Sequence, residues 1–135
     1  MKKYVGVKCV EAEPRKNLDG RDGYAVIYPD GYESWSPKEV FENAYIQVGD
    51  DNSIKEYNVN EFIKDYDVMQ WGDKTTIVNA TLANGFIITE SSSCVDPSNF
   101  NLDLGANIAK EKIRNRVWGM LGFVLQCGIN GIKRM

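Results

Sequence analysis

Residues 102–126 contain no proline and place apolar side chains at helical spacing, which constrains the fold more than any other stretch of the chain. The spacing predicts one long helix, whose apolar face comprises Leu104, Ile108, Ile113, Val117, Leu121, Val124 and Leu125. Such a face has to be covered by another layer of secondary structure. The preceding sequence is rich in strand patterns, so we expect the helix to pack on a β-hairpin.

The hairpin is predicted shortly before the helix. Residues 75–82 are rich in β-branched side chains, and residues 86–90 form a second strand-like run. Between them stands Asn84-Gly85, a dipeptide typical of hairpin turns because both residues accept a positive φ. Residues 91–101 are polar and are expected to form a loop that leads to the long helix.

An antiparallel sheet is predicted near the N-terminus. Residues 3–13 alternate in the period of two that is typical of a strand. Residues 23–28 and 32–35 predict two further strands, joined by a turn at Pro29-Asp30-Gly31. Proline presets φ in such a turn, and glycine accepts a positive φ. We therefore expect a hairpin preceded by one more strand.

Two shorter helices are predicted between these regions. Ser36 can cap the first helix, with Pro37 at its first helical position. Residues 49–53 are rich in glycine, aspartate and serine and resemble a linker. Beyond them, residues 59–66 place apolar side chains at helical spacing.

The sequence thus predicts an α+β protein, with an antiparallel sheet and hairpins packed against a short helix and one long C-terminal helix. We expect an N-terminal strand and helix module in residues 1–48. A linker with a short helix is expected in residues 49–73, and the second hairpin with the long helix in residues 74–135.

The chain has no histidine, which excludes Ser-His-Asp and Cys-His catalysis and histidine-dependent zinc sites. Its cysteines, Cys9, Cys94 and Cys127, are widely spaced and form no C-x-x-C motif. We expect them to be reduced in a cytosolic protein. No nucleotide-binding glycine loop and no assignable pair of acidic groups is present. We therefore expect no catalytic residue, metal ion or cofactor.

The charge is unevenly distributed. The net charge is −3, which argues against duplex nucleic acid as the main partner, and no apolar run is long enough to span a membrane. Residues 1–70 carry a net charge of −5 and residues 71–135 a net charge of +2. Four of the basic side chains lie at positions 110, 112, 114 and 116. They form either an anion-binding surface or an ordinary solvated helix face.

A ligand site is most plausible where these cations meet the polar loop before the helix. Hydroxyl and amide groups recognise a ligand by hydrogen bonds, arginine binds phosphate, and aromatic rings stack on nucleobases. The candidate ligand-binding residues are Arg114, Arg116, Lys110, Phe86, Asn79, Ser92, Ser93, Asn99 and Phe100. The alternative is structural: Asn84 is a turn residue, and Asp96 and Asn99 cap the loop and the helix.

The aromatic residues between Tyr24 and Tyr45 are a second feature of interest. Most of these aromatic side chains are expected in a core, because they alternate along a predicted hairpin or pack against a short helix. Those left exposed, with Tyr32 and Trp35 as candidates, would form a surface for a protein partner.

Two segments resemble known phage proteins. Lys3-Tyr4-Val5-Gly6-Val7-Lys8, Tyr28-Pro29-Asp30-Gly31-Tyr32 and Trp35-Ser36-Pro37-Lys38-Glu39-Val40-Phe41 resemble a module that in some phage proteins precedes a Thoeris anti-defence domain. Val78-Asn79-Ala80-Thr81-Leu82, Asn84-Gly85-Phe86, Glu90-Ser91-Ser92-Ser93-Cys94-Val95-Asp96-Pro97, Asn99-Phe100 and Trp118 with Leu121-Gly122-Phe123 resemble a family of small phage proteins called gp-forty-nine-like. The resemblance implies an accessory phage protein in the host bacterial cytoplasm, and such proteins often act against host immunity.

From this we expect a non-catalytic sponge that sequesters a cyclic nucleotide or cyclic ADP-ribose signal. Nanomolar binding needs about −12 kcal/mol, which requires an enclosed pocket, most simply in a homo-oligomer. Gly119 and Gly122 beside Trp118 would allow two long helices to approach. The alternative is an interaction protein that docks on a host or phage protein. An enzyme acting on the same messengers is least favoured.

Overall fold

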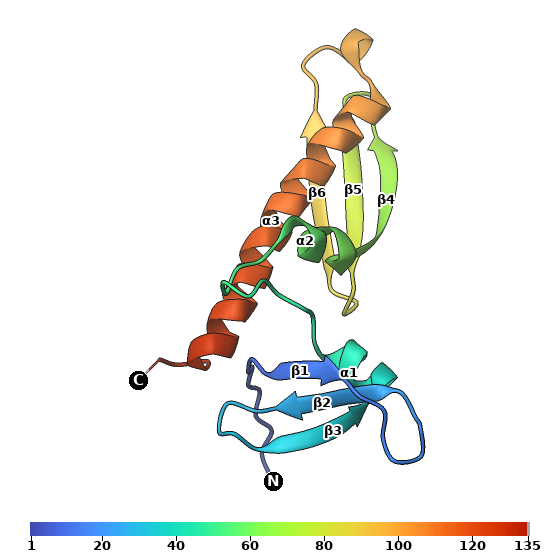
Figure 1. The fold of residues 1–135 in the computed structure, drawn as a ribbon. Helices are drawn as coiled ribbons and strands as arrows, with labels where there is room; N and C mark the ends of the chain where they lie inside the picture. The colour runs from blue at the N-terminus through green and yellow to red at the C-terminus, as the bar shows by residue number, and fades with distance from the viewer. Residues whose placement is uncertain (135) are drawn as a thin grey trace. The chain divides into compact units, whose positions relative to one another are not determined.

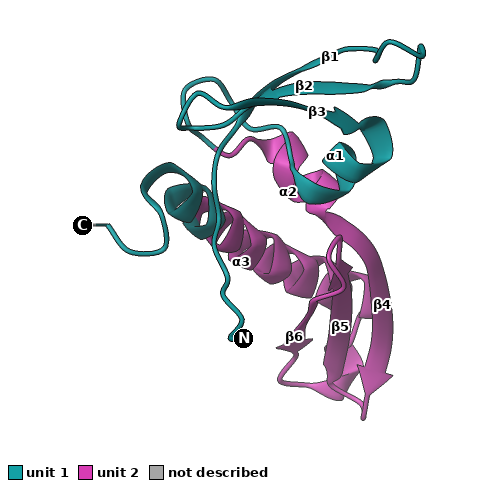
Figure 2. Cartoon of the chain, turned by 90° about the horizontal axis from the view of Figure 1, so that it is seen from below, with its two compact units in different colours: residues 1–53, 123–135 teal, residues 54–122 magenta. Residues whose placement is uncertain are grey.

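The computed structural model describes residues 1–134, which form two compact units (Figures 1 and 2). Unit 1 comprises residues 1–53 and the chain from Phe123 onward, and unit 2 comprises Ile54–Gly122. Within the described residues, two three-stranded antiparallel sheets, short helices and one long C-terminal helix are present. The predicted α+β class is confirmed.

The sheet of unit 1 is formed by β1 (Glu11–Pro14), β2 (Gly23–Ile27) and β3 (Glu33–Pro37), in the order β1-β2-β3. The predicted turn between β2 and β3 is present, and Gly31 has a φ of 88°. Helix α1 (Lys38–Ala44) packs on one face, where the Phe41 ring stacks on Tyr24 with centroids 4.3 Å apart. The sheet thus has one covered face.

The N-terminal strand is shorter than predicted, because only Glu11–Pro14 pairs with β2. The alternating residues before Glu11 have no strand beside them among the described residues. The Cys9 amide instead donates to the carbonyl oxygen of Gly128, at 3.1 Å. An alternating pattern shows what a segment can do in a sheet, but pairing also needs a neighbouring strand.

The predicted cap of α1 is wrong by one residue. Ser36 lies in β3, opposite Tyr24, and its hydroxyl makes no capping hydrogen bond. Pro37 is the N-cap instead, with a φ of −56°. Its missing N–H is no loss at that position, because the first N–H groups of a helix have no partner within the helix.

Unit 2 is built on β4 (Ile63–Trp71), β5 (Thr75–Leu82) and β6 (Ile87–Ser93), in the order β4-β5-β6. Helix α2 (Glu56–Phe62) precedes the sheet. A short 3-10 helix, η1 (Pro97–Asn99), and the long helix α3 (Leu102–Asn130) follow it. The predicted β5–β6 hairpin is confirmed, with Gly85 at a φ of 88°. Helix α3 crosses one face of this sheet and continues into unit 1 (Figure 1).

Strand β4 was not predicted. The helical spacing of residues 59–66 holds only as far as Phe62, and Ile63–Trp71 then pairs with β5 along the whole strand. The register shifts between Ile63 and Asp65, which hides the period of two at the start of the strand. Helix and strand patterns are hard to separate where one element follows the other directly.

The connection before α3 is also shorter than predicted, because β6 continues to Ser93. The Asp96 side chain accepts a hydrogen bond from the Ser98 amide and caps η1, as predicted. The amide of Leu104, in the first turn of α3, donates to Asn101 Oδ1 rather than to Asn99. The expected helix cap is therefore two residues further along the chain.

The core of unit 2 lies between α2, α3 and one face of the sheet. Its buried members are Val59, Val78, Ala80, Leu82, Ile88, Ala106, Ala109, Ile113, Val117 and Leu121. The predicted apolar face of α3 is therefore partly wrong, because Leu104, Ile108 and Val124 are exposed. Ala106 and Ala109 take part instead, because small side chains let the helix lie close to the sheet.

Candidate functional site

The face of the β4–β5–β6 sheet turned away from α3 is not covered by any described element of unit 2. Strand register decides which side chains lie there, because directly paired residues share a face. We call this surface the open sheet face. It comprises Asp65, Asp67, Met69, Trp71, Thr75, Ile77, Asn79, Thr81, Ile87, Thr89, Ser91 and Ser93.

Three large apolar side chains of the open sheet face are exposed to solvent. Trp71 is 66% exposed, Ile87 is 60% exposed, and Met69 is also exposed. An exposed tryptophan on a regular strand is costly to leave in water, and tryptophan is enriched where proteins bind one another. Trp71 and Met69 were missed in the sequence because residues 59–66 were predicted as a short helix and no strand was predicted after it. The available signal was the alternation of polar Asp65 and Asp67 with apolar Tyr66 and Val68.

Cross-strand hydrogen bonds tie the polar residues of the same face together. The Thr89 hydroxyl donates to Asn79 Oδ1 at 2.6 Å, and the hydroxyls of Thr75 and Ser93 lie 2.8 Å apart. These two hydrogen bonds restrict the four side chains that form them, two pairs on neighbouring strands.

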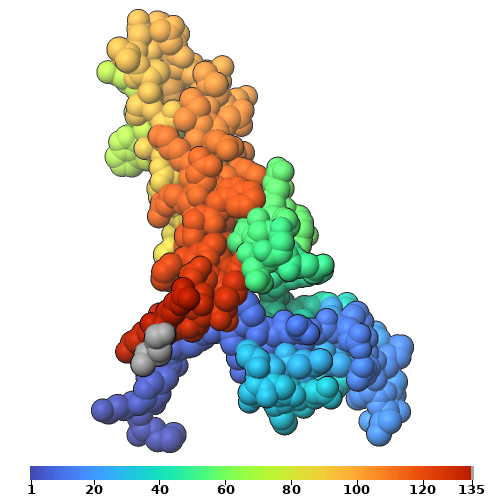
Figure 3. Space-filling model, turned by 60° about the vertical axis from the view of Figure 1, so that its left-hand side comes forward, coloured from blue at the N-terminus to red at the C-terminus, as the bar shows by residue number. Residues whose placement is uncertain are grey.

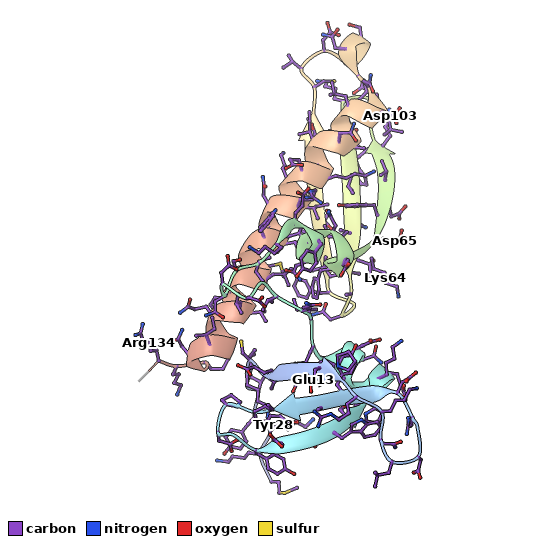
Figure 4. The ribbon with its side chains drawn as sticks, in the orientation of Figure 1. Glu13, Tyr28, Lys64, Asp65, Asp103 and Arg134 are labelled. Carbon is purple, nitrogen blue, oxygen red and sulfur yellow. The ribbon has the colours of Figure 1, made fainter. Side chains whose placement is uncertain are left out.

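The β4 edge of the open sheet face is acidic. Asp65 lies opposite Thr81, Asp67 lies opposite Asn79, and neither carboxylate has an ion pair among the residues described (Figure 4 labels Asp65). Two unpaired negative charges beside an apolar patch favour a partner with lysine or arginine at the matching position.

The four cations of α3 form two separate pairs on either side of its buried stripe. On one flank, Lys110 Nζ lies 5.0 Å from the centre of the Tyr66 ring. Arg114 donates to Asn60 Oδ1 and lies 3.6 Å from Glu56 Oε1, so it ties α3 to α2. Burial raises the pKa of the Tyr66 phenol above its ordinary value, and the nearby Arg114 guanidinium opposes that rise.

On the opposite flank, the cations bind β6. Lys112 Nζ donates to the Ser91 carbonyl oxygen at 2.7 Å, and Arg116 Nη1 lies 3.1 Å from Glu90 Oε2. Residues two apart on a helix point about 200° apart, so the two flanks cannot form one cluster. All four cations have partners that help to hold α3 on the sheet and on α2.

The structure does not bring the predicted ligand-binding residues together in one pocket. Asn79 and Ser93 lie on the open sheet face, whereas Ser92 lies on the side that faces α3. Phe86 follows the hairpin turn, at the start of β6.

Asn99 and Phe100 follow the other end of β6, in η1 and at its C-cap. The predicted loop over residues 91–101 could have brought the candidate ligand-binding side chains around a ligand. A regular strand instead separates its two ends and sends alternate side chains to opposite faces.

The aromatic residues of unit 1 mostly contact one another. Phe41 stacks between Tyr24 and Tyr45, and the rings of Tyr28 and Tyr32 stack with centroids 5.8 Å apart. Trp35 belongs to neither stacked group. Its Nε1 donates a hydrogen bond to the Arg15 carbonyl oxygen at 2.7 Å, which fixes the position of the ring.

Three further findings concern metal ligands, cysteines and membrane spans. In residues 1–134 no three histidine, cysteine, aspartate or glutamate side chains gather in a way that could hold a metal ion. All three cysteines are free, with Cys127 buried and Cys9 and Cys94 half-buried. No helix of these residues has both the length and the apolar character needed to cross a bilayer.

Comparison of the sequence with models of known protein families shows which family the chain belongs to. The model of the phage protein family named after N4 Gp49 and phage Sf6 gene 66 matches residues 40–129, two thirds of the chain. The chain belongs to this family. The matched residues include all of unit 2, and therefore the open sheet face and the four cations of α3.

The other comparisons add no relative. No curated protein and no solved structure matches the chain. Residues 1–39 of this phage protein precede the matched span, so the resemblance of its N-terminal module to Thoeris anti-defence proteins stays a prediction.

Proposed function

We propose that this phage protein acts by binding a host or phage protein on its open sheet face, in the cytoplasm of the infected bacterium. The observation that carries the proposal is the exposure of Trp71, Met69 and Ile87 on one regular sheet surface. At about 25 cal/mol per Å² of apolar area, covering such side chains favours association. Tryptophan often supplies a large share of that energy.

The chemistry of the face indicates what kind of partner fits. Trp71, Met69 and Ile77 lie together towards one end of the face, and two pairs of its polar groups already bind one another, so an apolar protein surface can cover these side chains without leaving those polar atoms unpaired. Asp65 and Asp67 require a basic margin on the partner. We therefore propose a partner whose apolar patch is bordered by lysine or arginine beside the β4 edge.

A binding role also agrees with the side chains available. The chain lacks histidine, and on α3 Lys112, Arg114 and Arg116 are held by internal acceptors. Histidine is the side chain most often used for proton transfer, so its absence favours holding a partner over transforming it. This supports a function without turnover.

The test is affinity capture from infected cells with tagged protein, comparing wild type with Trp71→Ser. Phe123→Ser is the matched control, because Phe123 is an exposed aromatic side chain on α3 outside the open sheet face. We expect Trp71→Ser to lose a specific partner and Phe123→Ser to retain it. With the purified partner, Trp71→Ser should weaken binding at least tenfold.

Charge neutralisation provides a second readout. The double variant Asp65→Asn, Asp67→Asn should slow association and reduce its dependence on salt, because exposed charges act mainly on the rate of encounter. Equal capture by wild type and Trp71→Ser, both folded by circular dichroism, would exclude the open sheet face as the binding surface.

Sequestration of a cyclic nucleotide or cyclic ADP-ribose signal is the second proposal. The feature that favours it is the flank where half-buried Arg114 and Lys110 converge beside Tyr66. A phosphate there would have to replace the contacts of Arg114 with Asn60 and Glu56. Tight binding therefore requires α2 to move, or a second copy to complete the pocket.

Titration calorimetry against cyclic dinucleotides, cyclic trinucleotides and cyclic ADP-ribose isomers tests the second proposal. A sponge should give saturable heat that Arg114→Met reduces, and unmodified ligand should return when the complex is heated. The absence of heat with every compound would exclude sequestration of these messengers. Loss of the intact ligand would instead indicate an enzyme.

A further inference from the structure

The sheet of unit 1 has a second face, away from α1, that forms an acidic groove of about 390 Å³. Strand register places Glu11, Ile27 and Glu33 in one row of this face and Glu13, Ala25 and Trp35 in the next. We call it the acidic groove. Its floor is apolar, and three glutamates line it.

Most of the negative charge in the acidic groove is not neutralised. Glu13 pairs with Arg15 at 2.7 Å, whereas Glu11 and Glu33 have no ion pair among the described residues. The Trp35 ring lies over Gly23, where an added Cβ would come within 2.3 Å of the ring. The hydrogen bond from Trp35 to the Arg15 carbonyl oxygen holds the ring there. The groove therefore suits a cationic segment with small apolar side chains.

The N-terminal residues have the matching composition. Met1–Lys8 contains Lys2, Lys3 and Lys8 and places Val5 and Val7 two residues apart, as on one face of a strand. No described strand pairs with this segment, and Tyr4 and Val5 are 91% and 84% exposed. We call residues 1–7 the N-terminal arm. Figure 3 shows the start of the chain, in dark blue, projecting from the rest of unit 1.

The root of the arm is held within unit 1. Lys8 Nζ lies 4.4 Å from the centre of the Tyr28 ring, and the Cys9 amide binds the Gly128 carbonyl oxygen. Gly128 is needed at this contact, because a Cβ there would lie 2.8 Å from Cys9 Sγ. Tyr28 follows Ile27 of the groove and so alternates to the other side of the sheet, and an arm rooted beside Tyr28 would have to pass around the sheet to reach the groove of its own molecule. The groove of a second molecule requires no such path.

We propose that two copies of this chain exchange N-terminal arms, each arm lying in the acidic groove of the other copy. An extended arm of seven residues spans about 23 Å, and three strands span roughly 10 Å, so the arm is long enough to cross the groove. Its lysines meet Glu11 and Glu33, and Val5 and Val7 meet the apolar floor. The exchange is reciprocal, as a twofold dimer requires. It uses unit 1 and is independent of the open sheet face.

Light scattering coupled to size-exclusion chromatography tests the exchange through charge reversal. Wild type should be a dimer that dissociates as salt rises, because the paired charges are exposed. The arm variant Lys2→Glu, Lys3→Glu and the groove variant Glu11→Lys, Glu33→Lys should each be monomeric, with dimer affinity at least tenfold weaker. An equimolar mixture of the two should form a heterodimer, because each arm then meets a groove of opposite charge.

The matched control is Lys133→Glu, Arg134→Glu, which reverses two basic residues of the exposed C-terminal tail and should leave the dimer intact. All the altered side chains are exposed, and circular dichroism checks that each variant is folded. A monomeric wild type would overturn the proposal, even if its arm were protected from proteolysis. A dimer that survives deletion of residues 1–7, but is lost in Gly122→Leu, would also overturn it and would assign dimerisation to α3.

Discussion

At the scale of single residues, α3 and β5 approach each other closely where Gly105 meets Thr76. A Cβ on Gly105 would lie 2.3 Å from Thr76 Oγ1 and 2.8 Å from Thr76 Cβ. Thr76 is fully buried, and its hydroxyl has no hydrogen-bond partner among the described residues. The sequence marks Gly105 only as a weak helix former, whereas the structure shows that its missing side chain lets the helix approach the strand.

The same substitution should therefore have opposite effects at two glycines of α3. Gly105→Ala should lower the free energy of unfolding by about 1–3 kcal/mol, because the methyl group overlaps Thr76. Gly119→Ala should raise it by up to about 1 kcal/mol, because a Cβ there meets no atom and alanine favours the helix. Urea denaturation measures both values. Destabilisation of equal size at both positions would contradict the close contact.

Asp96 predicts a dependence on pH. Hydrogen bonds from the amide and the hydroxyl of Ser98 hold the pKa of the Asp96 carboxyl below its ordinary value. The folded state therefore favours the charged form, and its contribution to stability is complete above the unfolded pKa of about 3.9. That contribution is lost as pH falls through the lower folded pKa.

Asp96→Asn should keep the cap but remove this titration. Between pH 5 and pH 2, the free energy of unfolding should fall less in the variant than in wild type, as measured by urea denaturation at several pH values. An unchanged pH dependence would show that Asp96 does not contribute to acid sensitivity.

At the scale of elements, α3 shows why a periodic pattern is an incomplete guide to a buried face. The 3.6-residue period predicted one broad stripe, but the sheet and α2 cover only part of it. Ile113 is fully buried between α3 and the sheet, whereas Ile108 is 43% exposed. The cations on either flank mark the edges of the covered stripe, because Lys110 and Arg114 contact one side of it and Lys112 and Arg116 the other.

Alanine substitution should separate these two isoleucines. Ile113→Ala should lower the free energy of unfolding by about 2–5 kcal/mol, because it leaves a cavity in the core of unit 2. Ile108→Ala should change it by less than about 1 kcal/mol, because that side chain is already in contact with water. Thermal and urea unfolding measure the difference, and similar losses at both sites would contradict the assignment of the buried stripe.

At the scale of the whole molecule, one helix contributes to both units. Residues 102–122 of α3 complete the core of unit 2, and residues 123–130 belong to unit 1, where Gly128 anchors Cys9. The ten buried residues of the unit 2 core all lie between Val59 and Leu121. The end of the helix is therefore dispensable for that core, but it is needed to hold the N-terminal segment.

A chain that ends at Gly122 should show this division in hydrogen exchange. The amides of β5 should stay protected, because their ladder partners and the core remain. The Cys9 amide should exchange much faster than in the full chain, because its acceptor is removed. Loss of protection in β5 would show that the core of unit 2 depends on residues beyond Gly122.

The sequence by itself determined the α+β class, both hairpin turns, the position of the long helix and the membership of a phage family. These features depend on local chemistry. Each signal, whether glycine in a turn, β-branched residues in a strand or the period of a helix, can be read from a few neighbouring residues. The N-terminal pattern was equally clear, but a strand also needs a neighbouring strand, and residues before Glu11 have none within residues 1–134.

Only the tertiary structure decided which side chains meet. Strand register placed Trp71, Met69 and Ile87 on one open face and separated the predicted ligand-binding residues between two faces and both ends of β6. Helix rotation divided four neighbouring cations into two flanks. Such relations join residues far apart in the chain and depend on pairing and packing, which no local pattern encodes.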